Sequence, residues 1–225
     1  MPAVPRAGFI LVLVALAVAL GDWVAVALGR RRAEYVLKPA VIVALIGAAV
    51  VLRGGDPAAR WAFTLAALAF SLAGDVILML PGDLFAAGLG AFLLAHLAYV
   101  AAFTPTVPPL LPTLPAGIAV GVVGVALFVR ISQAMVLAGR RSLVLPVGAY
   151  VVAITAMAVS AVATAGRAEW PPKSSAMAIA GALLFYTSDA LIGWSRFVGD
   201  FRGSRVLIMA AYHLGQVGLV LGLLG

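Results

Sequence analysis

Long apolar runs, separated by short segments rich in charged residues, proline or glycine, make up most of the 225-residue chain. Each run has about 20 residues, the length that an α-helix needs to cross the ~30 Å hydrocarbon layer of a membrane. The pattern predicts an all-α fold, a polytopic membrane helix bundle of eight transmembrane helices in a single domain, 1–225. The predicted helices are 8–29, 36–52, 60–80, 84–103, 111–130, 143–165, 175–195 and 205–224.

Composition supports this prediction and narrows the chemistry. Apolar residues make up 64% of the chain and charged residues 10%, against roughly 45–50% and 25% in a soluble domain. The absence of cysteine excludes disulfides, thiol nucleophiles and zinc-thiolate sites. The net charge of +7 does not indicate a nucleic-acid partner, because the arginines are scattered over connecting segments.

The first apolar run allows a second interpretation. Arg6, the run itself and the segment Ala25-Val26-Ala27 resemble a cleaved signal sequence. The run is long for the apolar part of a signal sequence, and Asp22 interrupts the approach to the cleavage site. We therefore predict a membrane helix here.

The basic residues predict the orientation of the bundle. With eight helices the two termini lie on the same side, and the opposite side carries more Lys and Arg. The positive-inside rule places that basic side in the cytoplasm and both termini outside. We expect a multi-pass integral protein of a bacterial inner (plasma) membrane. The residues on the basic side are Arg30, Arg31, Arg32, Arg130, Arg140, Arg141, Arg196, Arg202 and Arg205.

Two aspartates lie inside predicted membrane helices, Asp75 and Asp189. A carboxylate costs at least a few kcal/mol in the membrane interior, so we expect each to have a function or a partner. Other polar residues lie in the cytoplasmic half of several helices, which predicts one polar pocket that opens toward the inner leaflet. These residues are Asp22, Lys38, His96, Tyr99, Tyr186, Ser188, Tyr212 and Gln216.

Polar residues three or four apart along one helix share a face, so we expect them to form hydrogen-bonded couples. Metal binding has little support, since the two histidines have only scattered aspartates around them, and we expect neither a metal nor a cofactor. The expected couples are Ser71 with Asp75, Tyr186 with Asp189, His96 with Tyr99, and Tyr212 with Gln216.

A weak internal duplication relates the two halves of the chain. Segment 74–78 is similar to 188–192, and segment 96–100 is similar to 213–217. Since four predicted helices separate the copies, the halves 1–103 and 111–225 would be parallel repeats, joined by the proline-rich segment 104–115. Chance similarity in Ala/Val/Leu-rich sequence is the alternative.

Five motifs follow one another along the chain: Lys38-Pro39, 71–79, 96–99, 188–191 and 212–216. This ordered series resembles the YhhN family, which includes the lysoplasmalogenases. The resemblance implies hydrolysis of the vinyl ether bond of a lysoplasmalogen, with a fatty aldehyde and glycerophosphoethanolamine or glycerophosphocholine as products. It implies Asp75 and Asp189 as the catalytic pair, and water and a lysophospholipid from the bilayer as the reactants.

Hydrolysis of a vinyl ether begins with protonation of the β carbon, gives an oxocarbenium ion, and proceeds by addition of water. It needs a positioned acid and a nearby carboxylate, as glycosidases do. Asp75 has the more apolar neighbours and is favoured as the acid, although the sequence leaves this open. We expect Lys38 to meet the substrate phosphate or neutralise an aspartate. The other candidate substrate-binding residues are His96, Tyr99, Tyr186, Ser188, Tyr212 and Gln216.

Two alternatives to catalysis remain at this level. The aspartates could form a buried structural pair with Lys38 or a tyrosine that fixes the register of the helices, or serve as protonation sites of a proton-coupled small-molecule or lipid transporter. If they are the catalytic pair, both carboxyl groups should face one cavity, within about 5–10 Å of each other. Nothing in the sequence indicates an oligomeric state.

Overall fold

The structure is a computed structural model that describes residues 6–53, 57–103 and 110–225. Within these residues the chain forms eight α-helices, two 3-10 turns and no strand, and all eight helices are long and apolar enough to cross a membrane. The predicted all-α, multi-pass bundle is therefore confirmed. The helices are α1 (Arg6–Ala27), α2 (Arg31–Val51), α3 (Ala58–Met79), α4 (Phe85–Phe103), α5 (Leu110–Leu137), α6 (Val144–Val162), α7 (Pro172–Phe197) and α8 (Ser204–Leu224); the 3-10 turns are Arg141–Leu143 and Ala163–Gly166.

Helix α5 differs most from its predicted range, because it continues seven residues past 130. Arg130 therefore lies in a helix and not in a connecting segment. The helix ends at Leu137, and Gly139, two residues later, has a φ of +71°, the left-handed conformation that glycine favours. The predicted linker 104–115 lies partly outside the described residues, and its part from Leu110 onward belongs to α5.

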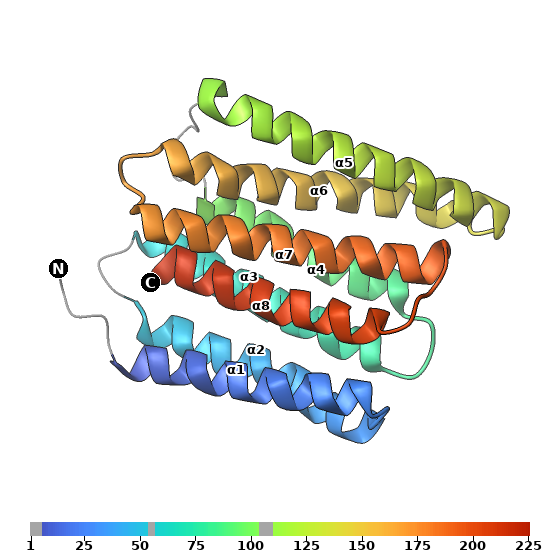
Figure 1. Cartoon of the computed structure of the whole chain (residues 1–225), viewed down its shortest axis with the longest axis horizontal. Coiled ribbons are helices and arrows are strands. Elements are labelled where there is room, and N and C mark those ends of the chain that lie inside the picture. Colours follow the sequence, from blue (N-terminus) through green and yellow to red (C-terminus); the bar gives the residue numbers. More distant parts are fainter. Residues whose placement is uncertain (1–5, 54–56, 104–109) are drawn as a thin grey trace.

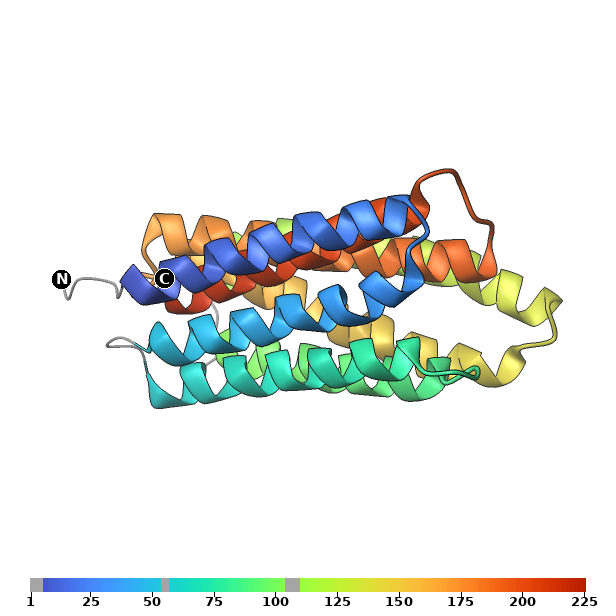
Figure 2. The ribbon, with the colours of Figure 1, turned by 90° about the horizontal axis from the view of Figure 1, so that it is seen from below.

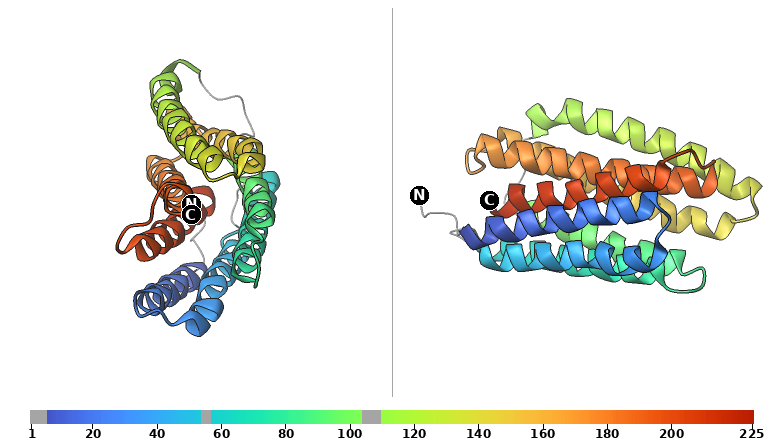
Figure 3. Two further views of the ribbon diagram at one scale, coloured as in Figure 1. Left: turned by 90° about the vertical axis from the view of Figure 1, so that its right-hand side faces the viewer. Right: turned by 60° about the horizontal axis from the view of Figure 1, so that its bottom comes forward.

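The helices run along one common axis, with both termini at the same end of the bundle (Figure 1). They form two layers: α1, α8 and α7 lie on one side, and α2, α3, α4 and α6 on the other (Figures 2 and 3). Helix α5 lies at one edge, where it contacts α6 and α7. Large apolar side chains such as Leu13, Val125 and Val152 are exposed on the outside, as expected of a surface that faces lipid.

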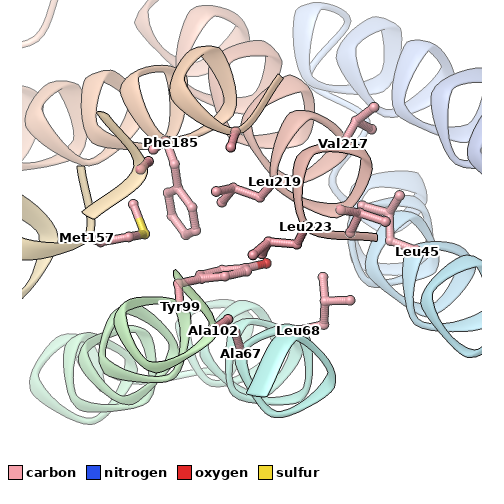
Figure 4. Close-up of a cluster of buried hydrophobic side chains, with 14 of the residues drawn as sticks. Leu45, Ala67, Leu68, Tyr99, Ala102, Met157, Phe185, Val217, Leu219 and Leu223 are labelled. Atoms are coloured by element: carbon pink, nitrogen blue, oxygen red, sulfur yellow. The ribbon is translucent and has the colours of Figure 1, made fainter. Parts of the chain in front are cut away.

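A buried apolar core fills the space between the two layers. Phe185 and Leu219 of one layer point toward Tyr99 and Met157 of the other (Figure 4). All four side chains are fully buried. Because apolar side chains fill this space, a polar group at the same depth needs a hydrogen-bond or ion-pair partner within the protein.

Glycines bring the backbones of α7 and α8 into contact. A Cβ atom at Gly181 would lie 2.5 Å from the backbone nitrogen of Leu219, and one at Gly218 would lie 2.7 Å from the Cα atom of Gly181. Small residues at helix interfaces allow this close approach in membranes. The contact fixes α7, which carries Asp189, against α8, which carries Tyr212.

Candidate active site

Asp75 lies at the meeting point of α2, α3 and α8. Its carboxylate is fully buried, and the Lys38 Nζ atom is 3.0 Å from Oδ1. The Tyr212 hydroxyl donates a hydrogen bond of 2.8 Å to Oδ2. We call these three residues the Asp75 cluster. The buried carboxylate thus has one cation and one neutral donor, which offset the cost of removing it from water.

Asp189 lies in a second group of polar residues, formed by α4, α6 and α7. The Tyr150 hydroxyl donates a hydrogen bond of 2.5 Å to Oδ2 of Asp189. The His96 Nε2 atom is 3.1 Å from the same oxygen, and Nδ1 is 3.3 Å from the Met157 sulfur. We call Asp189, Tyr150 and His96 the Asp189 cluster.

Aromatic rings separate the two clusters. The Phe185 ring makes edge contacts with His96, at 4.8 Å between centroids, and with Tyr212, at 5.3 Å. Phe92 contacts both Phe185 and Tyr212. The expected single polar pocket is therefore replaced by two polar clusters on either side of an aromatic layer.

The remaining predicted polar residues connect helices. The Tyr99 hydroxyl donates a hydrogen bond of 2.6 Å to Gln216, and the Gln216 amide donates one of 2.9 Å to Ser71. The Ser188 hydroxyl donates to the backbone carbonyl of Ile208. These bonds join α3 to α4 through α8, and α7 to α8, and so they hold the helices that carry the aspartates.

Three of the four couples expected within single helices are not the ones that form. Ser71 bonds Gln216 and not Asp75, His96 contacts Asp189 and not Tyr99, and the Tyr186 hydroxyl lies beside Gly124 of α5. Residues on one buried face of a helix point together toward the neighbouring helix, so partners there take the hydrogen bonds. Only the fourth couple interacts as expected, Tyr212 with Gln216.

An apolar cavity of about 70 Å³ lies between α3, α4, α5, α6 and α7. Asp189, Tyr150 and Tyr186 are the lining residues that carry polar side-chain groups. Asp75 does not contribute to its wall, so the two carboxyl groups do not both face this space. The apolar part of the wall includes Leu78, Phe85, Leu89, Phe92, Leu127, Ile131, Val147, Val151, Ile154, Ile192 and Phe197.

A polar cavity of about 390 Å³ adjoins the apolar one. Leu78, Phe85 and Ile192 line both, so the two cavities share a wall. Lys38 reaches the polar cavity and thereby links it to the Asp75 cluster. The other polar lining residues are Glu34, Ser195, Arg196, Asp200, Ser204 and Arg205.

The charged groups of the polar cavity are held in place by partners. Arg205 contacts both oxygens of Glu34, at 2.7 and 3.0 Å. The Arg196 guanidinium lies 4.1 Å from the centroid of the Phe85 ring, which the two cavities share. In the segment before α8, hydrogen bonds from the Ser204 hydroxyl and the Phe201 N–H hold the pKa of Asp200 below its ordinary value of 3.8.

Sequence reasoning missed Tyr150, the residue closest to Asp189. A signal was present, because Tyr150 lies seven residues into the predicted helix 143–165, the same depth as the other polar groups. Asp22, left open between pocket and packing, is fully buried in α1. Among the described residues no three His, Asp or Glu side chains gather in a way that could hold a metal ion.

Comparisons with known proteins place this arrangement in a family. The model of the YhhN family matches residues 33–223. The chain is 32% identical to the lysoplasmalogenase of Mycobacterium tuberculosis (strain CDC 1551 / Oshkosh) over 199 residues, which are 86% of the chain and 71% of that relative. It is 33% identical to lysoplasmalogenase TMEM86B of Homo sapiens over 163 residues, 70% of the chain and 62% of the relative. No solved structure matches. The chain belongs to the YhhN family.

Proposed function

We propose that the protein is an intramembrane hydrolase that cleaves the vinyl ether bond of a lysoplasmalogen and releases a fatty aldehyde and glycerophosphoethanolamine or glycerophosphocholine. Relatives named lysoplasmalogenase, from bacteria and mammals, support a lysoplasmalogen-cleaving enzyme. The observation that carries the proposal is the pair of adjoining cavities, one apolar with Asp189 in its wall and one polar.

The two cavities match the two parts of a lysophospholipid. The single hydrocarbon chain matches the apolar cavity in chemistry, because the wall is formed mainly by Leu, Ile, Val and Phe side chains, and its entry requires the helices to move apart. The glycerophosphate headgroup fits the polar cavity, where Lys38 and Arg205 offer cationic groups to the phosphate. The vinyl ether, which joins chain and headgroup, then lies where the cavities meet.

Asp189 is the aspartate in a position to touch the substrate. In the proposed mechanism its protonated form gives a proton to the β carbon, whose π electrons form the new C–H bond while the ether oxygen supports the oxocarbenium ion. The Asp189 carboxylate then takes a proton from the water that attacks the α carbon. Finally the hemiacetal C–O bond breaks, and the hemiacetal proton passes to the departing glycerol oxygen.

Asp75 has a different role in this proposal from the one that its sequence surroundings favoured. The Lys38 ammonium, 3.0 Å away, pairs with the Asp75 carboxylate, and Asp75 does not line the apolar cavity, so it is not in a position to protonate the substrate. The Asp75 cluster faces the Asp189 cluster across one aromatic layer. We therefore assign Asp75 to stabilisation of the positive charge that develops on the substrate.

The direction of the site in the membrane follows from the basic residues. Helices α2 and α8 begin, and α7 ends, at the end of the bundle opposite the start of α1 (Figure 1). These helix ends carry the charged residues of the polar cavity, Glu34, Lys38, Arg196 and Arg205. This is the arginine-rich end that the positive-inside rule assigns to the cytoplasm. The proposal therefore includes a polar cavity that opens toward the cytoplasmic side of a bacterial inner membrane.

The test is incubation of the purified protein with a lysoplasmalogen and with an ester lysophospholipid, with aldehyde release as the measurement. We expect aldehyde from the lysoplasmalogen alone. Asp189→Asn should lower kcat by about 10²–10⁴-fold, the range for loss of a general acid. The matched control is Glu169→Gln, an acidic residue at the other end of the bundle.

Two results would contradict the proposal. Absence of aldehyde from the unsubstituted protein would exclude the hydrolase, and full activity of Asp189→Asn would exclude the mechanism. A proton-coupled transporter, the alternative that the sequence allows, would move lysophospholipid between vesicle leaflets and leave it intact. Recovery of the lysoplasmalogen unchanged, together with its transfer across the bilayer, would therefore favour transport.

A further inference from the structure

Asp22 of α1 is a buried carboxyl group that the proposed function does not use. Its side chain is fully buried, and neither carboxyl oxygen has a hydrogen-bond partner within the described part of the chain. Burial of an isolated carboxylate is so costly that such groups are neutralised or paired. The family match begins at residue 33, so it assigns no role to Asp22.

The charged groups around Asp22 come from α2, α3 and α8. Glu34 and Arg205 form an ion pair with each other, so their charges cancel. The Trp23 indole donates a hydrogen bond of 3.1 Å to Nδ1 of His213, which therefore acts as a neutral imidazole. The charges left to balance belong to Asp22, Lys38 and Asp75. The groups that interact electrostatically with Asp22 are Glu34, Lys38, Asp75 and Arg205.

The net charge of two carboxyl groups and one ammonium is zero only if one of the carboxyl groups is protonated. Lys38 is 3.0 Å from Asp75, whereas no cation contacts Asp22 within the described residues. We propose that Asp22 and Asp75 share the Lys38 ammonium and a single proton, and that in this structure Asp22 holds the proton while Lys38 pairs with Asp75. We call these three residues the buried triad.

The triad has a second arrangement of equal net charge. If Asp75 takes a proton from the Lys38 ammonium and the resulting amine takes the proton of Asp22, Asp75 becomes the neutral acid and Lys38 pairs with the Asp22 carboxylate. One proton leaves Asp22 and one arrives at Asp75, so charge and atoms balance. Lys38 carries its ammonium on a flexible four-carbon side chain, and the proposal requires this side chain to turn from Asp75 toward Asp22. If the proposed function holds, this exchange removes the negative charge with which Asp75 stabilises the substrate cation.

Infrared spectroscopy tests the triad directly, because a protonated carboxyl group has a carbonyl stretching band that a carboxylate lacks. Isotope-labelled aspartate identifies the band as that of an aspartic acid. The experiment uses purified full-length protein in lipid vesicles at neutral pH. Every protein in this experiment also carries Asp189→Asn, so that the aspartic acid band reports on Asp22 and Asp75.

Charge balance predicts a different band for each variant. Asp22→Asn should lose the aspartic acid band, since the Lys38–Asp75 pair is neutral without it. Asp75→Asn should lose it as well, because Lys38 is then free to pair with Asp22, which gives up its proton. Lys38→Met should double the band, because both carboxyl groups then need a proton. The control is Leu20→Ala, at an exposed position of α1, which removes neither a charge nor a hydrogen bond and should keep the band.

The outcomes separate the inference from the proposed function, since no readout here depends on lysoplasmalogen cleavage. A band that survives in Asp22→Asn overturns the placement of the proton, and one that survives in Asp75→Asn overturns the sharing of Lys38. If a triad variant fails to fold, the spectrum of the Asp189→Asn protein with an unsubstituted triad still tests the proposal. Absence of an aspartic acid band there overturns the proposal, and a band of one group per protein supports it.

Discussion

Tyr150 and His96 meet at a single oxygen of Asp189, and the Tyr150 hydroxyl is 2.9 Å from the His96 Nε2 atom. The three residues come from α6, α4 and α7, so three helices fix one carboxyl group at the wall of the apolar cavity. A contact of this kind orients the carboxyl group before substrate arrives, which is the geometry that proton transfer to a bound substrate requires.

Loss of the Tyr150 hydroxyl should therefore impair the reaction more than binding. We expect Tyr150→Phe to lower kcat by about tenfold or more with little change in KM, since the ring that lines the cavity remains while the donor to Asp189 is lost. The measurement is steady-state aldehyde release. Tyr35→Phe, at an exposed tyrosine of α2, is the matched control and should keep full activity. A change in KM alone would argue against an orienting role.

Removal of the Lys38 charge should destabilise the bundle. We expect Lys38→Met to lower the free energy of unfolding by up to about 3–5 kcal/mol, because Asp75 is left buried without its cation. Acid should restore part of the loss, since a proton then replaces the cation. The measurement is unfolding in detergent across a pH series.

The control for Lys38 is Arg205→Met, which breaks a half-exposed ion pair and should cost only about 0–1 kcal/mol. The double variant Lys38→Met, Asp75→Asn should recover most of the lost stability. Equal losses of unfolding free energy in Lys38→Met and Arg205→Met would show that the buried Lys38–Asp75 pair stabilises the fold no more than the half-exposed pair does.

A methyl group added inside the apolar cavity should reduce the fit of the hydrocarbon chain. A Cβ atom at Gly124 would lie 2.6 Å from the Tyr186 hydroxyl, so Gly124→Ala must displace that side chain. We expect a rise in KM that grows with chain length, measured with substrates of graded length. Gly121→Ala, one turn earlier on α5 and next to open space, should leave KM unchanged.

A methyl group at the α7–α8 contact should weaken the fold. A Cβ atom at Gly218 would lie 2.7 Å from a backbone atom of Gly181, and backbone cannot move aside as a side chain can. We expect Gly218→Ala to lower the unfolding free energy by about 1–3 kcal/mol or more. Gly90→Ala, which meets open space, should be neutral or slightly stabilising. Thermal unfolding in detergent separates the two.

The start of α8 should be sensitive to acid. Since the folded-state pKa of Asp200 lies below its ordinary value of 3.8, its carboxylate contributes stability above that value and loses it as the pH falls through the folded pKa. We expect Asp200→Asn to lack this pH-dependent stability. Its unfolding midpoint should therefore change less between about pH 5 and pH 2 than that of the unsubstituted protein. Parallel pH curves for the two proteins would contradict this role.

The sequence was sufficient to predict the helices and the two aspartates, because membrane insertion imposes both signals. An apolar run of about 20 residues has few alternatives to a helix, and a carboxylate within it stands out by its cost. The partners of Asp75 and Asp189 could not be predicted in the same way. Which helix faces Tyr150 or Tyr212 depends on packing between segments far apart in the chain, and no spacing along one helix contains that information.

The division into two parallel halves stays a prediction, and the contacts of the aspartates bear on it. Asp75 is contacted by Lys38 of α2 and Tyr212 of α8, and Asp189 by Tyr150 of α6 and His96 of α4. Each aspartate thus meets the second helix of its own half and the last helix of the other. Two related four-helix units would produce such an exchange of partners.

The glycine contact between α7 and α8 also bears on how a lipid could enter. Because α7 and α8 are in backbone contact, we expect them to move as one body, with Asp189 and Tyr212 at a constant separation. Helix α5 instead meets α7 where Tyr186 lies against Gly124 and Ile131 lies against Gly193, that is, through side chains that can change rotamer. The α7–α8 pair is therefore the rigid side of the apolar cavity, and α5 is the side that we expect to move when a hydrocarbon chain enters.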